Sequence, residues 1–320
     1  MRIARSPEEA GKEPNSVVTV GSFDGVHEAH RVVLHMLVRR ARERGGRSVV
    51  ITFEPPPKTL LGPGAGKAEV LTTLDERSAL IGACGVDLLL VLPFTREFAG
   101  RTAAEFYEGL VAPGVGVAEV VVGHGHTFGR NREGRGEELR ALGSRLGFRV
   151  RELGPVTDDG RTISSTLIRD LLARGSVEEA ARLLGYPYSL ASRVVAGDGR
   201  GRTLGFPTAN LEPAAERKVV PADGVYLVDA PGTGPGMLNL GLRPTVTPGT
   251  RRTMEAHFFG FQGNLYGREL RVSFLQRLRD EKRFDTAEEL RAQLHADRDR
   301  ALSLMARIRP HETQRNDTDT

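Results

Sequence analysis

The chain has 320 residues, of which 39% are hydrophobic and 27% are charged, with 45 basic and 41 acidic side chains and a net charge of +4. This composition is typical of a folded globular protein and excludes fibrous and largely disordered classes. The basic residues are spread along the chain rather than gathered in a stripe, so we expect small-molecule partners and no nucleic acid. The length predicts two domains, each with its own core.

Cysteine usage and hydropathy indicate the cellular compartment in which the protein is expected. No uninterrupted apolar window approaches the roughly 18 residues of a membrane span, so we expect no membrane partner. The N-terminal segment MRIARSPEEAGKEP is charged and lacks the apolar stretch of a signal peptide. The single cysteine, Cys84, excludes an internal disulfide and fits a reducing compartment. We therefore expect a cytoplasmic protein and make no prediction of its oligomeric state.

Short apolar runs alternate with amphipathic stretches up to about residue 185. The runs predicted as strands are VVTV, RSVVITF, VDLLLVLPF, VAEVVVG and FRVREL, and helices are predicted at 30–44, 75–83, 101–110 and 136–146. This alternation predicts an α/β domain, a Rossmann-like parallel sheet with helices on both faces. Ligands of such sheets bind beyond the carboxyl ends of the strands.

The pattern changes in the second half of the chain. Two capped helices, SSTLIRDLLARG and SVEEAARLLG, come first. Residues 189–275 then hold short strand-like runs separated by Gly and Pro turns, which predicts a small antiparallel β-barrel, and 286–307 predict an amphipathic C-terminal helix. We therefore expect domains at 1–185 and 186–308 and a flexible tail at 309–320.

The segment GSFDGVHEAH, residues 21–30, follows the first predicted strand and begins a helix. His27 and His30 are three residues apart, so both rings lie on one helical face and can reach one ligand. A helix N-terminus offers N–H groups and a positive dipole end, which favour phosphate. A metal pair is one alternative, although zinc would need a third ligand. Two exposed histidines without a ligand are the other.

Two later segments carry groups that suit a triphosphate. VVGHGHTFGRNREG leaves another predicted strand and contains Arg130 and Arg132, and ISSTLIRDLL provides the hydroxyls of Ser165 and Thr166 with Arg169 one turn later. Hydroxyls, backbone N–H groups and arginines are the groups that bind phosphate oxygens. Together with the histidines, these segments predict a nucleotide site.

A second candidate site lies in VVAGDGRGRTLGFPTANL, residues 194–211. Its glycines allow the backbone to approach phosphate closely. Thr208 and Asn210 are two apart on a predicted strand, hence on one face, and present hard oxygen ligands suited to Mg2+. The alternative is a glycine-rich hairpin with an incidental PTAN. Glu255 and Glu269 are both candidate carboxylates on later strands, and the residues alone leave the choice between them open.

These motifs carry a resemblance to a known family. VTVGSFDGVHEAH, FEPPP, GHGHTFGRNREG and ISSTLIR, in this order, resemble the N-terminal half of the bacterial bifunctional riboflavin kinase/FMN adenylyltransferases, a nucleotidyltransferase domain marked by an H-x-G-H segment. The PTAN motif and its surroundings, over nearly all of residues 188–300, resemble the riboflavin kinase module. The resemblance implies ATP as co-substrate, Mg2+ as metal, and riboflavin and FMN as flavin substrates, with FMN and FAD as products.

The resemblance also implies roles for particular residues. His27 and His30 would hold the ATP phosphates as pyrophosphate leaves, Glu255 would accept the proton of the riboflavin 5′-hydroxyl, and Thr208 and Asn210 would hold Mg2+. Residues expected to bind nucleotide are Gly21, Phe23, Asp24, Ser165, Thr166, Arg169, Gly197, Gly199, Arg200, Gly201, Arg202 and Gly205.

Three positions depart from the family pattern: Ala29 replaces Gly, Pro56 replaces a frequent His, and Gly125 replaces Asp or Asn. Two alternative functions therefore stay open. One is a riboflavin kinase whose N-terminal domain binds nucleotide but is weak or inactive in FAD synthesis. The other is a non-catalytic flavin- or nucleotide-sensing module, which the presence of Thr208, Asn210 and Glu255 argues against.

Overall fold

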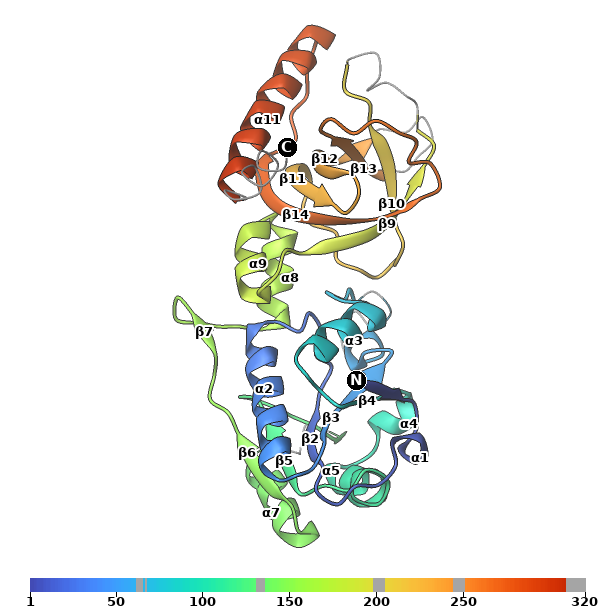
Figure 1. Cartoon of the computed structure of the whole chain (residues 1–320), viewed down its shortest axis with the longest axis vertical. Coiled ribbons are helices and arrows are strands. Elements are labelled where there is room, and N and C mark those ends of the chain that lie inside the picture. Colours follow the sequence, from blue (N-terminus) through green and yellow to red (C-terminus); the bar gives the residue numbers. More distant parts are fainter. Residues whose placement is uncertain (62–65, 67, 131–135, 198–204, 244–250, 309–320) are drawn as a thin grey trace, which may run out of the picture. The chain divides into compact units, whose positions relative to one another are not determined.

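The computed structural model describes residues 1–61, 66, 68–130, 136–197, 205–243 and 251–308. The chain divides into two compact units between Leu167 and Ile168 (Figure 1). This division falls inside helix α8 (Ser165–Ala173), and α9 (Val177–Leu184) belongs to the second unit because it packs on the barrel strand β14 (Glu269–Arg279). The sequence-based boundary at residue 185 stays a prediction.

A six-stranded parallel sheet forms the first unit, as predicted. Its strands are β1 (Arg2–Ala4), β2 (Val17–Val20), β3 (Ser48–Glu54), β4 (Leu88–Pro93), β5 (Glu119–Val122) and β6 (Arg149–Glu152), in the order β1-β4-β3-β2-β5-β6. All five pairings are parallel. The sequence analysis missed β1, because three residues carry too little pattern to read as a strand.

Helices cover both faces of this sheet. They are α1 (Pro7–Ala10), α2 (Glu28–Glu43), α3 (Leu74–Ala83), α4 (Arg96–Ala99), α5 (Ala103–Phe106), α6 (Ala112–Gly114) and α7 (Gly136–Leu146), with a 3-10 turn η1 (Pro57–Thr59) and a π-helical turn η2 (Tyr107–Val111). Alternate strand residues enter two separate cores: Val17 and Val50 pack with Leu34 of α2, whereas Val18 and Val49 pack with Tyr107 and Leu142. Burial on both faces explains the continuous Val and Leu runs.

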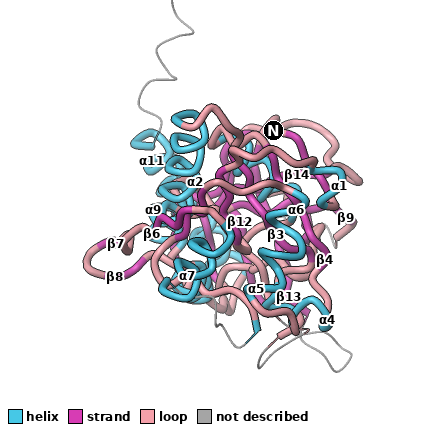
Figure 2. The backbone as a smooth tube through the Cα atoms, turned by 90° about the horizontal axis from the view of Figure 1, so that it is seen from below, coloured by secondary structure: helices cyan, strands magenta, loops and turns pink. Residues whose placement is uncertain are grey.

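A narrow ribbon links the sheet to α8. Strands β7 (Thr157–Asp158) and β8 (Arg161–Thr162) pair antiparallel, and Figure 2 shows them as a short projecting hairpin.

No described helix is long and apolar enough to cross a membrane.

The second unit contains a closed six-stranded antiparallel barrel, which confirms the predicted fold. Its strands are β9 (Ser189–Val195), β10 (Ala209–Pro213), β11 (Gly224–Ala230), β12 (Gly234–Arg243), β13 (Arg251–Phe258) and β14, in the order β10-β13-β12-β11-β14-β9. The C-terminal helix α11 (Ala287–Ile308) packs its Ala301 and Met305 against Val225 and Met237. Val225 and Met237 therefore lie on the outer face of the barrel, and α11 covers part of that face.

Candidate active sites

The first candidate site lies where the strand order of the parallel sheet reverses. Strand β2 pairs with β3 on one side and β5 on the other, and the GSFDGVH and GHGHTFG loops leave β2 and β5 at their carboxyl ends. This switch point is the usual ligand position in open parallel sheets. The turn after β2 is tight, because Phe23 and Val26 both have positive φ, 48° and 37°. A β-branched residue rarely adopts such an angle, so the loop is held by its surroundings.

The two histidines form a stacked pair at the start of α2. His27 is the N-cap, and its Nδ1 accepts a hydrogen bond from the His30 backbone N–H at 3.3 Å. The ring centroids lie 3.6 Å apart with an angle of 15° between planes. An imidazole nitrogen that accepts carries no hydrogen, so the proton of neutral His27 is on Nε2. Because Nδ1 accepts the N-cap hydrogen bond, Nε2 is the nitrogen of neutral His27 that can donate.

His30 is held in its neutral form. Burial, and then the neighbouring His27, lower the pKa of His30 well below 6.5. Its Nδ1 is enclosed and has no hydrogen-bond partner among the described residues. Phe23 is 4% exposed, and its ring packs against the His30 ring with 5.0 Å between the two centroids. Of the residues predicted to bind nucleotide, Phe23 thus lies beside the pair, and the nucleotide contact itself stays a prediction.

Asp24, also predicted to bind nucleotide, has a buried carboxylate that organises the loop. Its Oδ1 accepts from the backbone N–H groups of Leu71 at 2.8 Å and Thr72 at 3.1 Å, and Lys58 Nζ lies 2.7 Å from Oδ2. The Asp24 carbonyl accepts a 2.7 Å hydrogen bond from the Ser165 hydroxyl. The geometry therefore connects Asp24 and Ser165 to each other directly.

Three further residues predicted for this site are Gly21, Thr166 and Arg169. Gly21 packs against Phe23 so closely that a Cβ would lie 3.1 Å from its ring. Thr166 is exposed at the start of α8. Arg169 lies one turn further along α8, in the second unit.

Sequence reasoning missed Arg77, which lies on α3 and is fully buried. Its Nη1 donates to the Ser22 carbonyl at 3.1 Å, and its Nη2 donates to Glu54 Oε2 at 2.8 Å. Arg77 therefore fixes the backbone of the loop after β2 to the end of β3. No pattern could have revealed it, because an arginine on an amphipathic helix ordinarily reads as exposed.

The structure shows where the three positions that depart from the family pattern lie. Ala29 is in the first turn of α2 and has no positive φ, so the backbone there does not require glycine. Pro56 precedes η1 with φ of −59°. Gly125 has φ of +67° with open space around it, a conformation that Asn and Asp also tolerate.

The second candidate site is a polar row on the outer face of the barrel. Asn210 of β10 lies opposite Glu255 of β13, and Asn239 of β12 lies opposite Glu255 on the other side. Directly opposite residues of an antiparallel pair share a face, with Cβ atoms about 4.5–5.5 Å apart. The row is half-buried, so it is open to a ligand. Sequence reasoning missed Asn239, whose place depends on a register between distant segments.

The predicted nucleotide loop is described in part. The Gly197 backbone packs on Asn210 so tightly that a Cβ would lie 1.8 Å from Nδ2. Gly205 has φ of +83°, which favours glycine. The predicted residues Gly199, Arg200, Gly201 and Arg202 lie outside the described residues.

The fold distinguishes the two candidate carboxylates. Glu269 on β14 lies opposite Arg193 of β9, and β9 separates it from β10. Glu255 adjoins Asn210 directly. No group of three or more His, Cys, Asp or Glu side chains suited to a metal occurs in the described part of the chain. The residues directly opposite Glu255 are the amides Asn210 and Asn239.

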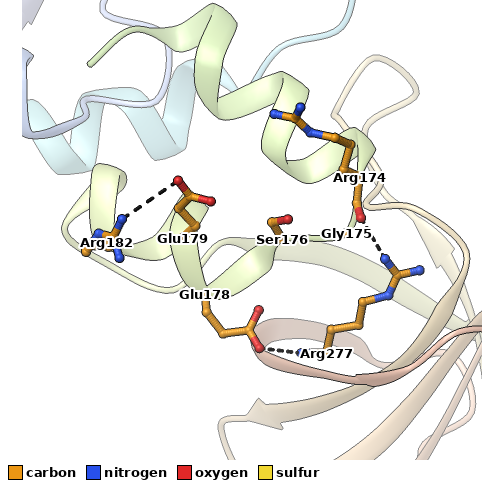
Figure 3. Close-up of a pocket in the computed structure, with 7 residues that line it drawn as sticks. All are labelled: Arg174, Gly175, Ser176, Glu178, Glu179, Arg182 and Arg277. Carbon is orange, nitrogen blue, oxygen red and sulfur yellow. Dashed lines mark hydrogen bonds and ion pairs between the residues drawn. The ribbon is translucent and has the colours of Figure 1, made fainter. Parts of the chain in front are cut away.

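A separate pocket of about 540 Å³ lies at the turn between α8 and α9 (Figure 3). Arg277 of β14 lines it and donates from Nη1 to the Arg174 carbonyl at 2.7 Å, while the Arg277 backbone N–H donates to Glu178 Oε1 at 3.0 Å. None of the predicted kinase residues that the structure describes lines this pocket. Its groups are occupied in joining the helices to the barrel.

The folds and sites together define a two-domain nucleotide-dependent transferase. The family described as FAD synthetase matches residues 9–167, and the riboflavin kinase family matches residues 184–305. The chain belongs to the family of bacterial bifunctional riboflavin kinase/FMN adenylyltransferases, the enzymes of flavin cofactor biosynthesis.

Curated relatives of that description match nearly the whole chain. The protein from Pseudomonas fluorescens is 40% identical over 91% of this chain and 93% of its own. The one from Escherichia coli K12 is 38% identical over 93% and 96%, and the one from Bacillus subtilis is 32% identical over 93% and 95%.

A solved structure has the same fold over both domains. The crystal structure described as a macrolide-efflux protein from Streptococcus pneumoniae is 33% identical, covers 94% of this chain and 98% of that one, and gives a TM-score of 0.85. That description differs from the names of the curated relatives, and the family matches of both domains agree with the latter.

Proposed function

We propose that the barrel unit phosphorylates riboflavin at the polar row around Glu255. Glu255 accepts the proton of the riboflavin 5′-hydroxyl as that oxygen attacks the γ-phosphorus of ATP, and ADP leaves. A base acting through a direct hydrogen bond contributes about a hundredfold or more to the rate. The observation that carries this proposal is the register that sets Asn210 opposite Glu255.

The donor atoms present fit Mg2+. Thr208 and Asn210 offer a hydroxyl and an amide oxygen, which are hard ligands, and the close Gly197 backbone leaves room for no side chain beside the Asn210 amide. When bound, the ion neutralises charge on the transferring phosphoryl group. Thr208 and Asn210 would hold the ion, while Glu255 accepts the proton of the attacking hydroxyl.

The second half of the proposed function is the transfer of AMP from ATP to FMN by the first unit. An FMN phosphate oxygen bonds to the α-phosphorus of ATP as the bond to the pyrophosphate oxygen breaks, without a covalent enzyme intermediate. The Nε2–H of His27 donates to the phosphate oxygens, and neutral His30 supports the ring by stacking. Catalysis here is positioning and charge stabilisation.

Chromatography of the flavins tests both halves. The purified chain is incubated with riboflavin, ATP and Mg2+, and the products are resolved. Both FMN and FAD are expected. FMN alone would restrict the function to the kinase, and unchanged riboflavin would support a sensing module. Glu255→Gln is expected to abolish FMN formation and to leave FMN-to-FAD conversion intact.

The partners in this proposal are riboflavin, FMN and ATP, and the location is the cytoplasm. A single cysteine in 320 residues supports a reducing compartment. The scattered charge supports small-molecule substrates over nucleic acid.

A further inference from the structure

Strand β13 carries a second polar side chain next to Glu255 on the outer face. His257 is two residues further along the strand, and alternation places both side chains on one face. The His257 Nδ1 lies 2.9 Å from the carbonyl oxygen of Pro207. Because a carbonyl only accepts, this contact requires the hydrogen of the imidazole on Nδ1. In a neutral His257 ring this contact selects the tautomer with its hydrogen on Nδ1.

The contact falls on the segment that precedes β10. Strand β10 begins at Ala209, which lies opposite Ala256, so Thr208 stands one residue outside the ladder. Pro207 has no N–H and so can donate no hydrogen bond to the ladder, although its carbonyl can accept one. Continued by one residue, the register sets Thr208 opposite His257, as Asn210 is opposite Glu255.

Phe206, the residue before Pro207, anchors the same segment in the core. Phe206 is 3% exposed and belongs to the core beneath α11. Its ring contacts His257 edge to face at 5.1 Å and His295 of α11 at 5.0 Å between centroids. His257 thus touches the segment twice, at a ring and at a carbonyl, immediately before Thr208.

We propose that His257 is a positioning residue of the kinase site, which fixes the Thr208 hydroxyl through the Pro207 carbonyl. This inference rests on the proposed function, in which Thr208 and Asn210 hold Mg2+. The hydrogen bond sets the distance between the two ligand oxygens and their place relative to Glu255. Outer partners that orient metal ligands commonly contribute about 10–100-fold to metal affinity or activity.

Two matched substitutions separate positioning from packing. In Asn the side-chain N–H sits close to where His257 carries Nδ1–H, whereas in Gln it sits closer to Nε2. His257→Asn is expected to keep a Mg2+ requirement near that of the wild type, and His257→Gln and His257→Leu are expected to raise the half-saturating Mg2+ concentration for FMN formation about tenfold or more. Nitrogen NMR of the ligand-free chain is expected to show the His257 hydrogen on Nδ1.

The outcomes keep the two proposals distinct. If wild type forms no FMN, or Glu255→Gln forms it at the wild-type rate, the proposed function fails whatever His257 does. If Glu255→Gln is inactive but all three His257 variants share one Mg2+ dependence, the positioning role is overturned. A hydrogen on Nε2, or an effect confined to the melting temperature, also overturns it.

Discussion

Asn210 and Asn239 flank Glu255 from opposite sides, each in direct register with it across an antiparallel ladder. Three strands from separate parts of the sequence thus build one polar row. In these two pairings the residues directly opposite the carboxylate are both amides.

Asn239→Ala is expected to lower the rate of FMN formation about tenfold or more, because it removes a polar neighbour that orients Glu255. FMN-to-FAD conversion by the same protein should stay at the wild-type rate. Asn264→Ala is the matched control, since Asn264 accepts from Tyr266 in a turn outside the row. Equal kinase rates for the two variants would contradict the role of Asn239.

Ala29→Gly tests the departure from the family pattern at the start of α2. Position 29 is helical. Glycine there is expected to destabilise the first unit by up to about 1 kcal/mol. The FMN-to-FAD rate should change by less than about twofold, or 0.4 kcal/mol in the barrier. A tenfold faster rate would show instead that the Ala29 methyl crowds the nucleotide.

Acid should weaken the first unit. Burial lowers the pKa of His126 to about 4, and the pKa of His30 is also well below 6.5. Between pH 6.5 and 4 the unfolded chain binds more protons than the native one, so stability present above pH 6.5 is lost as the pH falls. For 150–250 residues, each kcal/mol lost lowers the Tm by about 2–4 °C.

Thermal unfolding of wild type and His126→Asn from pH 7.5 to 5 measures this effect. The variant should show a shallower fall in Tm over that range. Parallel curves would rule out His126 as a source of the pH dependence.

Glu119→Gln should destabilise the first unit by about 1.5–3 kcal/mol, because it removes charge-assisted hydrogen bonds to the half-buried Arg40 and Arg44 and to the exposed Arg151. Glu119 is 1% exposed and accepts from Arg40, Arg44 and Arg151 at 2.8–3.0 Å. Burial raises its pKa, but these hydrogen bonds outweigh burial and lower it to about 2. Glu43→Gln, an exposed partner of the same Arg40, should cost less than about 1 kcal/mol in urea unfolding.

Gly175→Ala should destabilise the second unit by more than about 1 kcal/mol, through both strain and a clash. Gly175 has φ of +76°, and a Cβ would lie 2.4 Å from Arg277 Nη1 and 2.7 Å from the Tyr226 hydroxyl. Gly232→Ala is the control: φ is +80° there, with nothing within 4 Å. Equal losses in denaturant unfolding would mean that the packing of Arg277 contributes nothing.

Local sequence determined much of this protein. The Val and Leu runs predicted the parallel strands, since burial on both faces leaves no polar alternation, and the Gly and Pro turns predicted the barrel. Histidines three residues apart at a helix start and the PTAN motif marked both candidate sites, because each spacing alone sets two side chains on one face.

Tertiary structure decided what depends on contacts between distant segments. Barrel order sets Glu255, and not Glu269, directly beside Asn210, and Asn239 joins the row only through register. Arg77 reaches Ser22, and His257 reaches Pro207, across 55 and 50 residues of chain. No local periodicity encodes such contacts, because strand pairing and burial fix them only when the whole domain folds.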